Sequence, residues 1–164
     1  MGMYTKLHFQ AELKEDVPEE VIKHLQWMLG QAYQPKPFID HPLFQDTRAS
    51  WMLNCSSAYF PAVDHSTLYV RYDRWHLNVD CDFKNYSDEI AKFTDWIMPY
   101  VEAPIGEFLG YSLYEEHDEF QPPELIFKTP DKPLPHPVVL NVPTRYVGAV
   151  RLDRAAIEAE KEEK

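Results

Sequence analysis

The stretch "WHLNVDCDFKNYSDEIAKFTDW", residues 75–96, contains both of the periodicities that decide the fold. Its first half alternates apolar and polar residues, which predicts a strand with one face on the core. Its second half repeats apolar residues such as Ile90 and Phe93 at helical spacing. Ser87 is expected to cap this helix, and Pro99 to kink it or end it. A strand followed directly by a helix therefore lies at the centre of the chain.

Other segments repeat the same two patterns on either side of this centre. Residues 4–14 alternate cleanly and predict a half-buried strand. Residues 15–30 predict a helix that Asp16 caps and Gly30 ends. Further elements are predicted at these positions: a short helix at 46–53, an edge strand at 56–63, one long strand or two joined by a tight turn at 66–83, and strands at 107–116 and 123–128.

These elements interleave too loosely for a parallel, doubly wound sheet. The prediction is an α+β fold, a mostly antiparallel sheet with two main helices packed on one face, compatible with a ferredoxin-like arrangement. A single domain is expected over residues 3–128. Five prolines over 129–143 predict an extended segment at 129–150, and residues 151–164 predict a polar tail that is helical or disordered.

The overall charge restricts the partners of this chain. A net charge of −11 over 164 residues, with no run of Lys or Arg, argues against direct binding to nucleic acid or to an anionic membrane. A basic protein partner fits this charge. No apolar run approaches the ~20 residues of a membrane span. Cys55 and Cys81 are not in a zinc-binding spacing, so a cytoplasmic location with reduced thiols is expected.

Two patterns that would indicate chemistry are missing from the sequence. It has no glycine-rich loop that could cradle a phosphate and no nucleophile elbow around a serine. No cofactor is therefore expected.

One candidate site lies on the polar side of the predicted strands. If residues 4–14 and 75–83 are neighbours, His8, His76, Asp80 and Asp82 share one face. Such residues could hold a metal ion for a hydrolase. Carboxylates spaced two residues apart along one strand do not converge on one point, however, and a solvated sheet face also produces this alternation. We favour the solvated face and keep the metal-assisted hydrolase as the alternative.

The other candidate site is an acidic turn between two predicted strands. Residues 102–124 contain no Lys or Arg, and the sequence "EEHDE" concentrates acids there. The turn could dock a basic protein, or it could be a solvated hairpin tip. Its candidate binding residues are Glu115, Glu116, His117, Asp118 and Glu119.

Four segments, "LKEDVPEEVIKHL", "HPLFQDTRASWML", "CDFKNYSDEIAKFTDWIMPYV" and "FLGYSLYEEHDEFQPPELIF", give the chain a resemblance to other proteins. Over residues 3 to about 128 it resembles small uncharacterised proteins encoded by bacteriophages and prophages of actinobacteria. The resemblance implies an accessory phage protein that acts in the bacterial cytoplasm, and it implies no catalytic residues.

Together these observations predict a non-enzymatic, acidic protein-binding module, for example an inhibitor of a host protein. A homodimer is also compatible with the sequence. An edge strand such as 56–63 could pair across a two-fold axis, but Pro61 works against that pairing.

Overall fold

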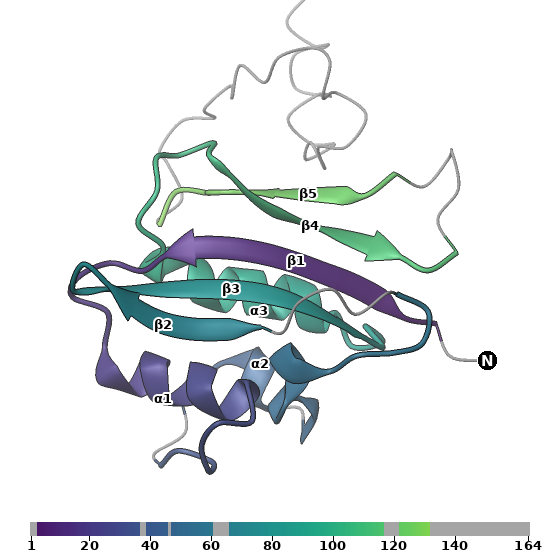
Figure 1. Cartoon of the computed structure of the whole chain (residues 1–164), viewed down its shortest axis with the longest axis horizontal. Coiled ribbons are helices and arrows are strands. Elements are labelled where there is room, and N and C mark those ends of the chain that lie inside the picture. Colours follow the sequence, from purple (N-terminus) through teal and green to yellow (C-terminus); the bar gives the residue numbers. More distant parts are fainter. Residues whose placement is uncertain (1–2, 37–38, 46, 61–65, 117–121, 132–164) are drawn as a thin grey trace, which may run out of the picture.

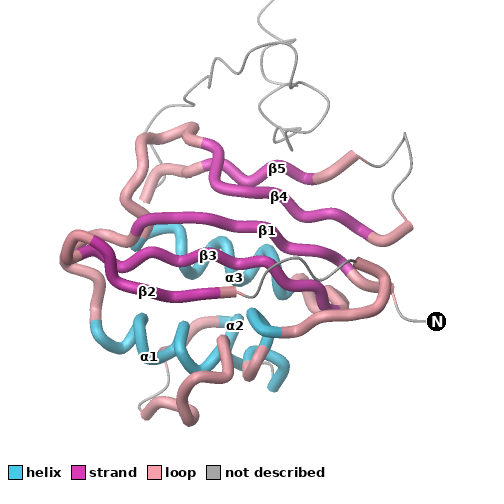
Figure 2. The backbone as a smooth tube through the Cα atoms, in the orientation of Figure 1, coloured by secondary structure: helices cyan, strands magenta, loops and turns pink. Residues whose placement is uncertain are grey.

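The computed structural model describes residues 3–36, 39–45, 47–60, 66–116 and 122–131. They form a five-stranded antiparallel sheet with helices packed against one face (Figures 1 and 2). This confirms the predicted α+β class. The Pro-rich segment and the polar tail lie outside the described residues from position 132 onward.

The strands are β1 (Thr5–Glu12), β2 (Thr67–Arg71), β3 (Arg74–Phe83), β4 (Phe108–Tyr114) and β5 (Glu124–Phe127). The helices are α1 (Glu19–Met28), α2 (Pro42–Gln45) and α3 (Glu89–Ile97), with 3₁₀ turns at Thr47–Ala49, Met52–Asn54 and Met98–Tyr100.

The strand order is β2-β3-β1-β4-β5. Because α1 follows β1 and α3 follows β3, the first four strands and these two helices have the ferredoxin-like order. β5 extends the sheet beyond β4 and forms one of its two edges, while β2 forms the other.

The alternation in the central stretch has the predicted consequence. Leu77, Val79, Cys81 and Phe83 of β3 are all buried in the core. The predicted apolar stripes of the two main helices are buried as well. The stripe of α1 consists of Val21, Ile22, Leu25, Met28 and, directly after the helix, Leu29. The stripe of α3 consists of Ile90, Phe93, Ile97 and, beyond the helix, Val101. Burial of these apolar faces is the main stabilising contribution.

The helix starts differ from the prediction. Asp88, not Ser87, is the N-cap of α3, and it has a left-handed backbone. The free N–H groups there are satisfied differently, because Asn85 Oδ1 accepts from Ile90 N at 3.0 Å and Glu89 Oε2 accepts from Ser87 N at 2.9 Å. At α1 the N-cap is Pro18 and no side chain caps the helix, so the expected role of Asp16 was also wrong.

Residues between α1 and β2 form less regular structure than predicted. The expected helix at 46–53 is replaced by the two 3₁₀ turns at Thr47–Ala49 and Met52–Asn54, with Trp51 between them in a left-handed conformation, and the short α2 lies before this segment. Gly30 ends α1 as predicted, with φ of 72°. A Cβ on Gly30 would lie 2.8 Å from the Trp51 ring, so glycine also makes room for this indole.

The edge strand lies later in the chain than predicted. Residues 56–60 do not form a strand, and 61–63 lie outside the described residues. Cys55 O accepts a hydrogen bond from Asp82 N at 3.1 Å, so the chain touches the end of β3 without continuing along it. The edge is β2, joined to β3 by the predicted tight turn at Tyr72 and Asp73.

Candidate functional site

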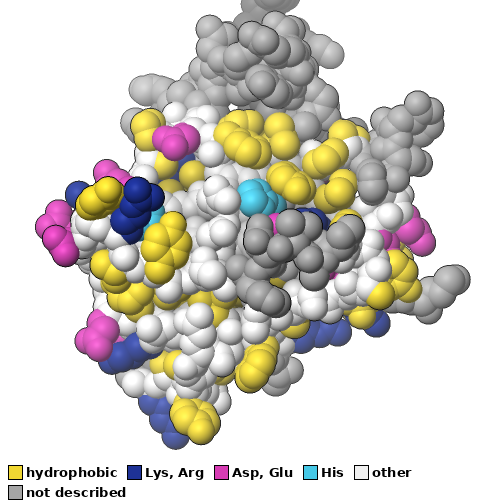
Figure 3. Space-filling view, in the orientation of Figure 1, with side chains coloured by type: hydrophobic (Ala, Val, Ile, Leu, Met, Phe, Trp, Pro, Cys, Tyr) yellow, Lys and Arg dark blue, Asp and Glu magenta, His cyan; other side chains and the backbone are white. Residues whose placement is uncertain are grey.

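The face of the sheet opposite the helices carries the polar residues singled out above. β1 and β3 are neighbours, as the sequence predicted, and they pair antiparallel. This pairing places His8 beside Asp80, Gln10 beside Asn78, and Glu12 beside His76. Figure 3 shows this face, with a histidine at its centre and hydrophobic side chains gathered over β4 and β5. The sheet face is therefore half polar and half apolar.

A small ionic cluster occupies the polar half. Lys6 Nζ lies 2.9 Å from Asp80 Oδ1, and His8 Nδ1 lies 3.5 Å from Asp80 Oδ2. Burial opposes the charge of Lys6, but the Asp80 contact outweighs it, so the pKa of Lys6 is raised. The His8 ring also stacks on Tyr111 at 5.4 Å. Lys6 alternates with His8 along the strand, which places it on this polar face, but it was not among the candidate site residues.

The structure does not assemble the alternative metal site. His76 and Asp80 are four residues apart on one strand, which separates them by about 13 Å. Asp80 is instead paired with Lys6. Among the described residues, no three His, Cys, Asp or Glu side chains gather closely enough to hold a metal ion. Asp82 is only 5% exposed, and its Oδ1 has no hydrogen-bond partner in the structure.

A second cluster lies where β1 begins, and we call it the tyrosine–cation patch. Its rings and cations alternate: Tyr59 stacks on Tyr4 at 5.3 Å, and the Lys84 ammonium lies 5.6 Å from the Tyr4 ring and 5.9 Å from the Tyr86 ring. The Arg48 guanidinium lies 5.4 Å from the centre of the Tyr86 ring. Tyr59 and Tyr86 are 58% and 52% exposed.

Sequence reasoning could not find this patch because its residues come from four separate segments. Tyrosine, tryptophan and arginine are enriched in protein interfaces and among the residues that dominate binding energy. Cations that already lie on aromatic rings also keep the rings ordered in the free protein. The patch therefore contains exposed tyrosine and arginine, two residue types that are common in protein interfaces.

The acidic turn adjoins this patch. Glu115 N donates to Tyr4 O at 2.9 Å, so the end of β4 lies beside the patch. Tyr114 OH lies 3.4 Å from Glu116 Oε2, and burial together with the charges of Glu116 and Glu115 raises the pKa of Tyr114. Glu115 Oε2 is buried and has no hydrogen-bond donor among the described residues. His117, Asp118 and Glu119 lie outside the described residues.

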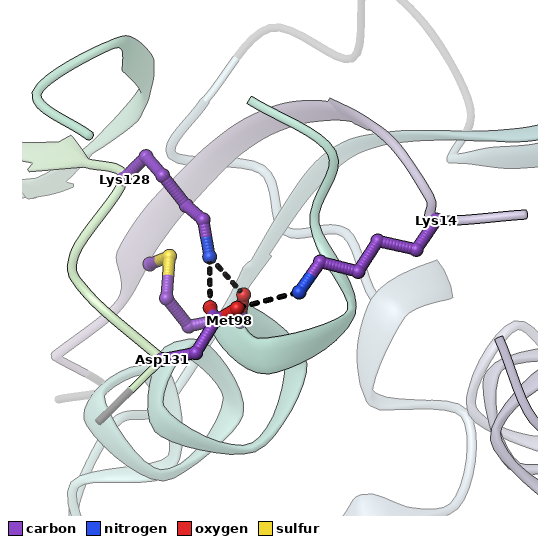
Figure 4. A network of polar contacts seen from close by, with 4 residues as sticks. All are labelled: Lys14, Met98, Lys128 and Asp131. Atoms are coloured by element: carbon purple, nitrogen blue, oxygen red, sulfur yellow. Dashed lines mark hydrogen bonds and ion pairs between the residues drawn. The ribbon is translucent and has the colours of Figure 1, made fainter. Parts of the chain in front are cut away.

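A third polar cluster holds the chain after β5 against the rest of the domain (Figure 4). Lys128 is only 4% exposed, and its Nζ donates to Met98 O at 2.7 Å and to Asp131. Lys14 Nζ donates to the other oxygen of Asp131 at 2.5 Å. Hydrogen bonds from Lys128 and Lys14 lower the pKa of Asp131 below its usual 3.8. This cluster is fully paired, which is typical of a structural role.

The two cysteines are free thiols. Burial, followed by the neighbouring charges, raises the pKa of Cys55, and it raises the pKa of the fully buried Cys81 further. A raised pKa leaves little thiolate near neutral pH, and the thiolate is the form that attacks or binds metal. Both thiols are therefore expected to be poor nucleophiles.

Comparison of the chain with protein-family models, with curated proteins and with solved structures finds no match. Within the described part of the chain, no helix is both long enough and apolar enough to cross a membrane.

Proposed function

We propose that this chain is a non-enzymatic module that binds another protein through the tyrosine–cation patch and the acidic turn beside it. The observation that carries the proposal is that the exposed rings of Tyr59 and Tyr86 lie beside the acidic end of β4, where Glu115 N donates to Tyr4 O. A Lys or Arg of a partner would pair with the exposed carboxylate of Glu116 while its neighbours covered the two rings.

The partner is accordingly a protein that presents basic side chains to the acidic turn. The chain carries a net charge of −11, which would speed its encounter with such a partner and weaken its contact with acidic proteins. The resemblance to actinobacteriophage proteins points to a host protein in the bacterial cytoplasm. A phage accessory protein that inhibits a host system fits this combination.

The test compares two charge reversals of equal size. One variant carries Glu115→Lys with Glu116→Lys, and its control carries Glu19→Lys with Glu20→Lys in the exposed first turn of α1. Each protein is used to capture partners from an actinobacterial lysate. The partner is then identified by mass spectrometry, purified, and titrated against each variant by calorimetry.

We expect the reversal at the acidic turn to weaken binding at least tenfold, corresponding to about 1.4 kcal/mol, and the control to change it little. Tyr86→Ala should weaken binding to a similar degree, because exposed aromatic residues dominate many interfaces. Equal binding by all variants would exclude this surface. Equal losses in both charge reversals would show that only net charge matters.

A further inference from the structure

The two edges of the sheet are protected to different degrees. β5 is four residues long, follows Pro122 and Pro123, and pairs with β4 next to a bulge, all of which are features that discourage further strand pairing. β2, Thr67–Arg71, has the sequence "TLYVR", with no proline, no lysine and no acidic residue. It pairs with β3 in unbroken register. Within the part of the chain that the structure describes, β2 is thus an unprotected edge.

Backbone groups along this edge are available for pairing. In a hairpin with a two-residue turn, the residues that flank the turn bond to each other, so Arg71, Tyr69 and Thr67 direct their N–H and C=O groups toward β3. The same groups of Leu68 and Val70 point away from the sheet. Neither residue makes a backbone hydrogen bond to any other described segment.

The side chains of β2 are also more exposed to solvent than those of the other strands. Val70 lies on the side of the sheet that the helices cover, yet it is 55% exposed. Tyr69, on the opposite side, is 45% exposed and stacks on His76 at 5.3 Å. An exposed apolar strand with free backbone groups is a site for the addition of another strand.

We infer that the edge of β2 is a dimerisation site, where β2 of a second copy of this chain pairs antiparallel about a two-fold axis at Tyr69. This sequence is complementary to itself in that register. Leu68 would lie opposite Val70 of the partner copy, Tyr69 opposite the same residue, and Arg71 opposite Thr67, so no like charges face each other. The outward groups of Leu68 and Val70 would form the hydrogen-bonded pairs, as their orientation requires.

Pro61, which was expected to oppose dimerisation, does not belong to the edge strand, because the edge is β2 (Thr67–Arg71) and contains no proline. The contact is short, and stable interfaces bury ~1,200–2,000 Å². The dimer is therefore expected to be weak, and screening of the net charge by salt should strengthen it. This inference is independent of the proposed partner surface, which lies at the start of β1.

Disulfide trapping of the full-length chain tests the register directly. In a Cys55→Ser background, which removes the exposed thiol, Tyr69→Cys places two cysteines opposite each other with Cα atoms about 4.5 Å apart, within disulfide range. Mild oxidation should give a covalent dimer. The matched control, Thr67→Cys in the same background, separates the two thiols by about 13 Å and should remain monomeric.

Sedimentation of the unmodified chain at increasing concentration, up to roughly 1 mM, provides the equilibrium measurement for a weak contact. We expect self-association that increases with salt and is lost in Val70→Pro, because proline removes the outward N–H without breaking a bond to β3. Circular dichroism checks that this variant folds, and Val70→Thr should associate nearly as well as the parent. A chain that is monomeric throughout, or that cross-links equally at both cysteine positions, would overturn the inference.

Discussion

At the scale of single residues, burial determines which titratable side chains matter for stability. His24 of α1 is fully buried among Trp27, Phe44 and Trp96. Its Nδ1 lies 2.6 Å from Glu20 O, and its Nε2 accepts from Ile39 N at 3.4 Å, which assigns the proton of the neutral ring to Nδ1. Burial, partly offset by Glu20, lowers the pKa of His24 below its usual 6.5.

The lowered pKa of His24 predicts a loss of stability in mild acid. Below pH 6.5 the unfolded chain binds a proton that the folded chain does not, so the free energy of unfolding falls as the pH falls. The slope from this site is at most about 1.4 kcal/mol per pH unit. Urea denaturation between pH 7 and pH 5 should show a smaller slope in His24→Gln than in the parent.

The control for this experiment is Leu25→Val, which changes the buried neighbour of His24 in α1 and leaves every titratable group in place. Its slope should match that of the parent. If His24→Gln and the parent have the same slope, His24 does not carry the acid sensitivity.

At the scale of elements, strand and helix ends are held together by contacts that no local pattern encodes. Lys128 follows β5, Met98 follows α3, and Lys14 follows β1, and Asp131 joins the two lysines. Similarly, Gly110 of β4 allows close approach to β1, since a Cβ there would lie 1.9 Å from His8 O. These contacts set the positions of whole elements.

The cluster around Lys128 should behave as a coupled unit. Asp131→Asn leaves a buried ammonium with a weaker partner and should lower the free energy of unfolding by about 1–3 kcal/mol. Adding Lys128→Met removes that buried charge. The double variant should therefore lose less free energy of unfolding than the two single variants lose together. Denaturant titrations of the four proteins in the cycle measure this coupling.

The exposed pair of Lys23 and Glu19 in α1, 2.9 Å apart, serves as the comparison. Exposed helix pairs contribute about 0.3–0.5 kcal/mol, so the corresponding cycle should show little coupling. If the losses of unfolding free energy in the Lys128 and Asp131 single variants add up to the loss in the double variant, the two side chains are not coupled and their ion pair does not have the assigned role.

At the scale of the whole molecule, the described core lies between one sheet face and the helices. Its most buried residues, such as Leu7, Phe9 and Phe93, all precede residue 131. The expected domain, residues 3–128, also ends before the proline-rich segment. Asp131 belongs structurally with this domain, because two lysines bind it.

Two truncations test where the stable unit ends. A chain that ends at residue 132 should keep cooperative unfolding and melt within about 3 °C of the full chain, a change of roughly 1 kcal/mol. A chain that ends at Phe127 loses Lys128 and Asp131, so it should melt several degrees lower. Thermal unfolding followed by circular dichroism distinguishes them. Loss of cooperative unfolding in the longer truncation would show that residues 133–164 contribute to the core.

The local patterns of the sequence determined the central strands, the two main helices and which of their faces are buried, but not the structure of residues 47–60. Alternation in residues 75–83 and helical spacing in α1 and α3 are repeated often enough to predict the burial of Leu77 or Phe93. Helix caps were less predictable, because several polar residues near Asp88 could satisfy the same backbone groups.

Only the tertiary structure decided which side chains from distant segments meet. It paired Asp80 with Lys6, gathered Tyr4, Tyr59 and Tyr86 into one patch, and placed β2 at an edge of the sheet. The physical reason is that burial of apolar faces acts locally and repeats along the chain. Contacts between segments depend on strand order and register, which the whole core sets at once.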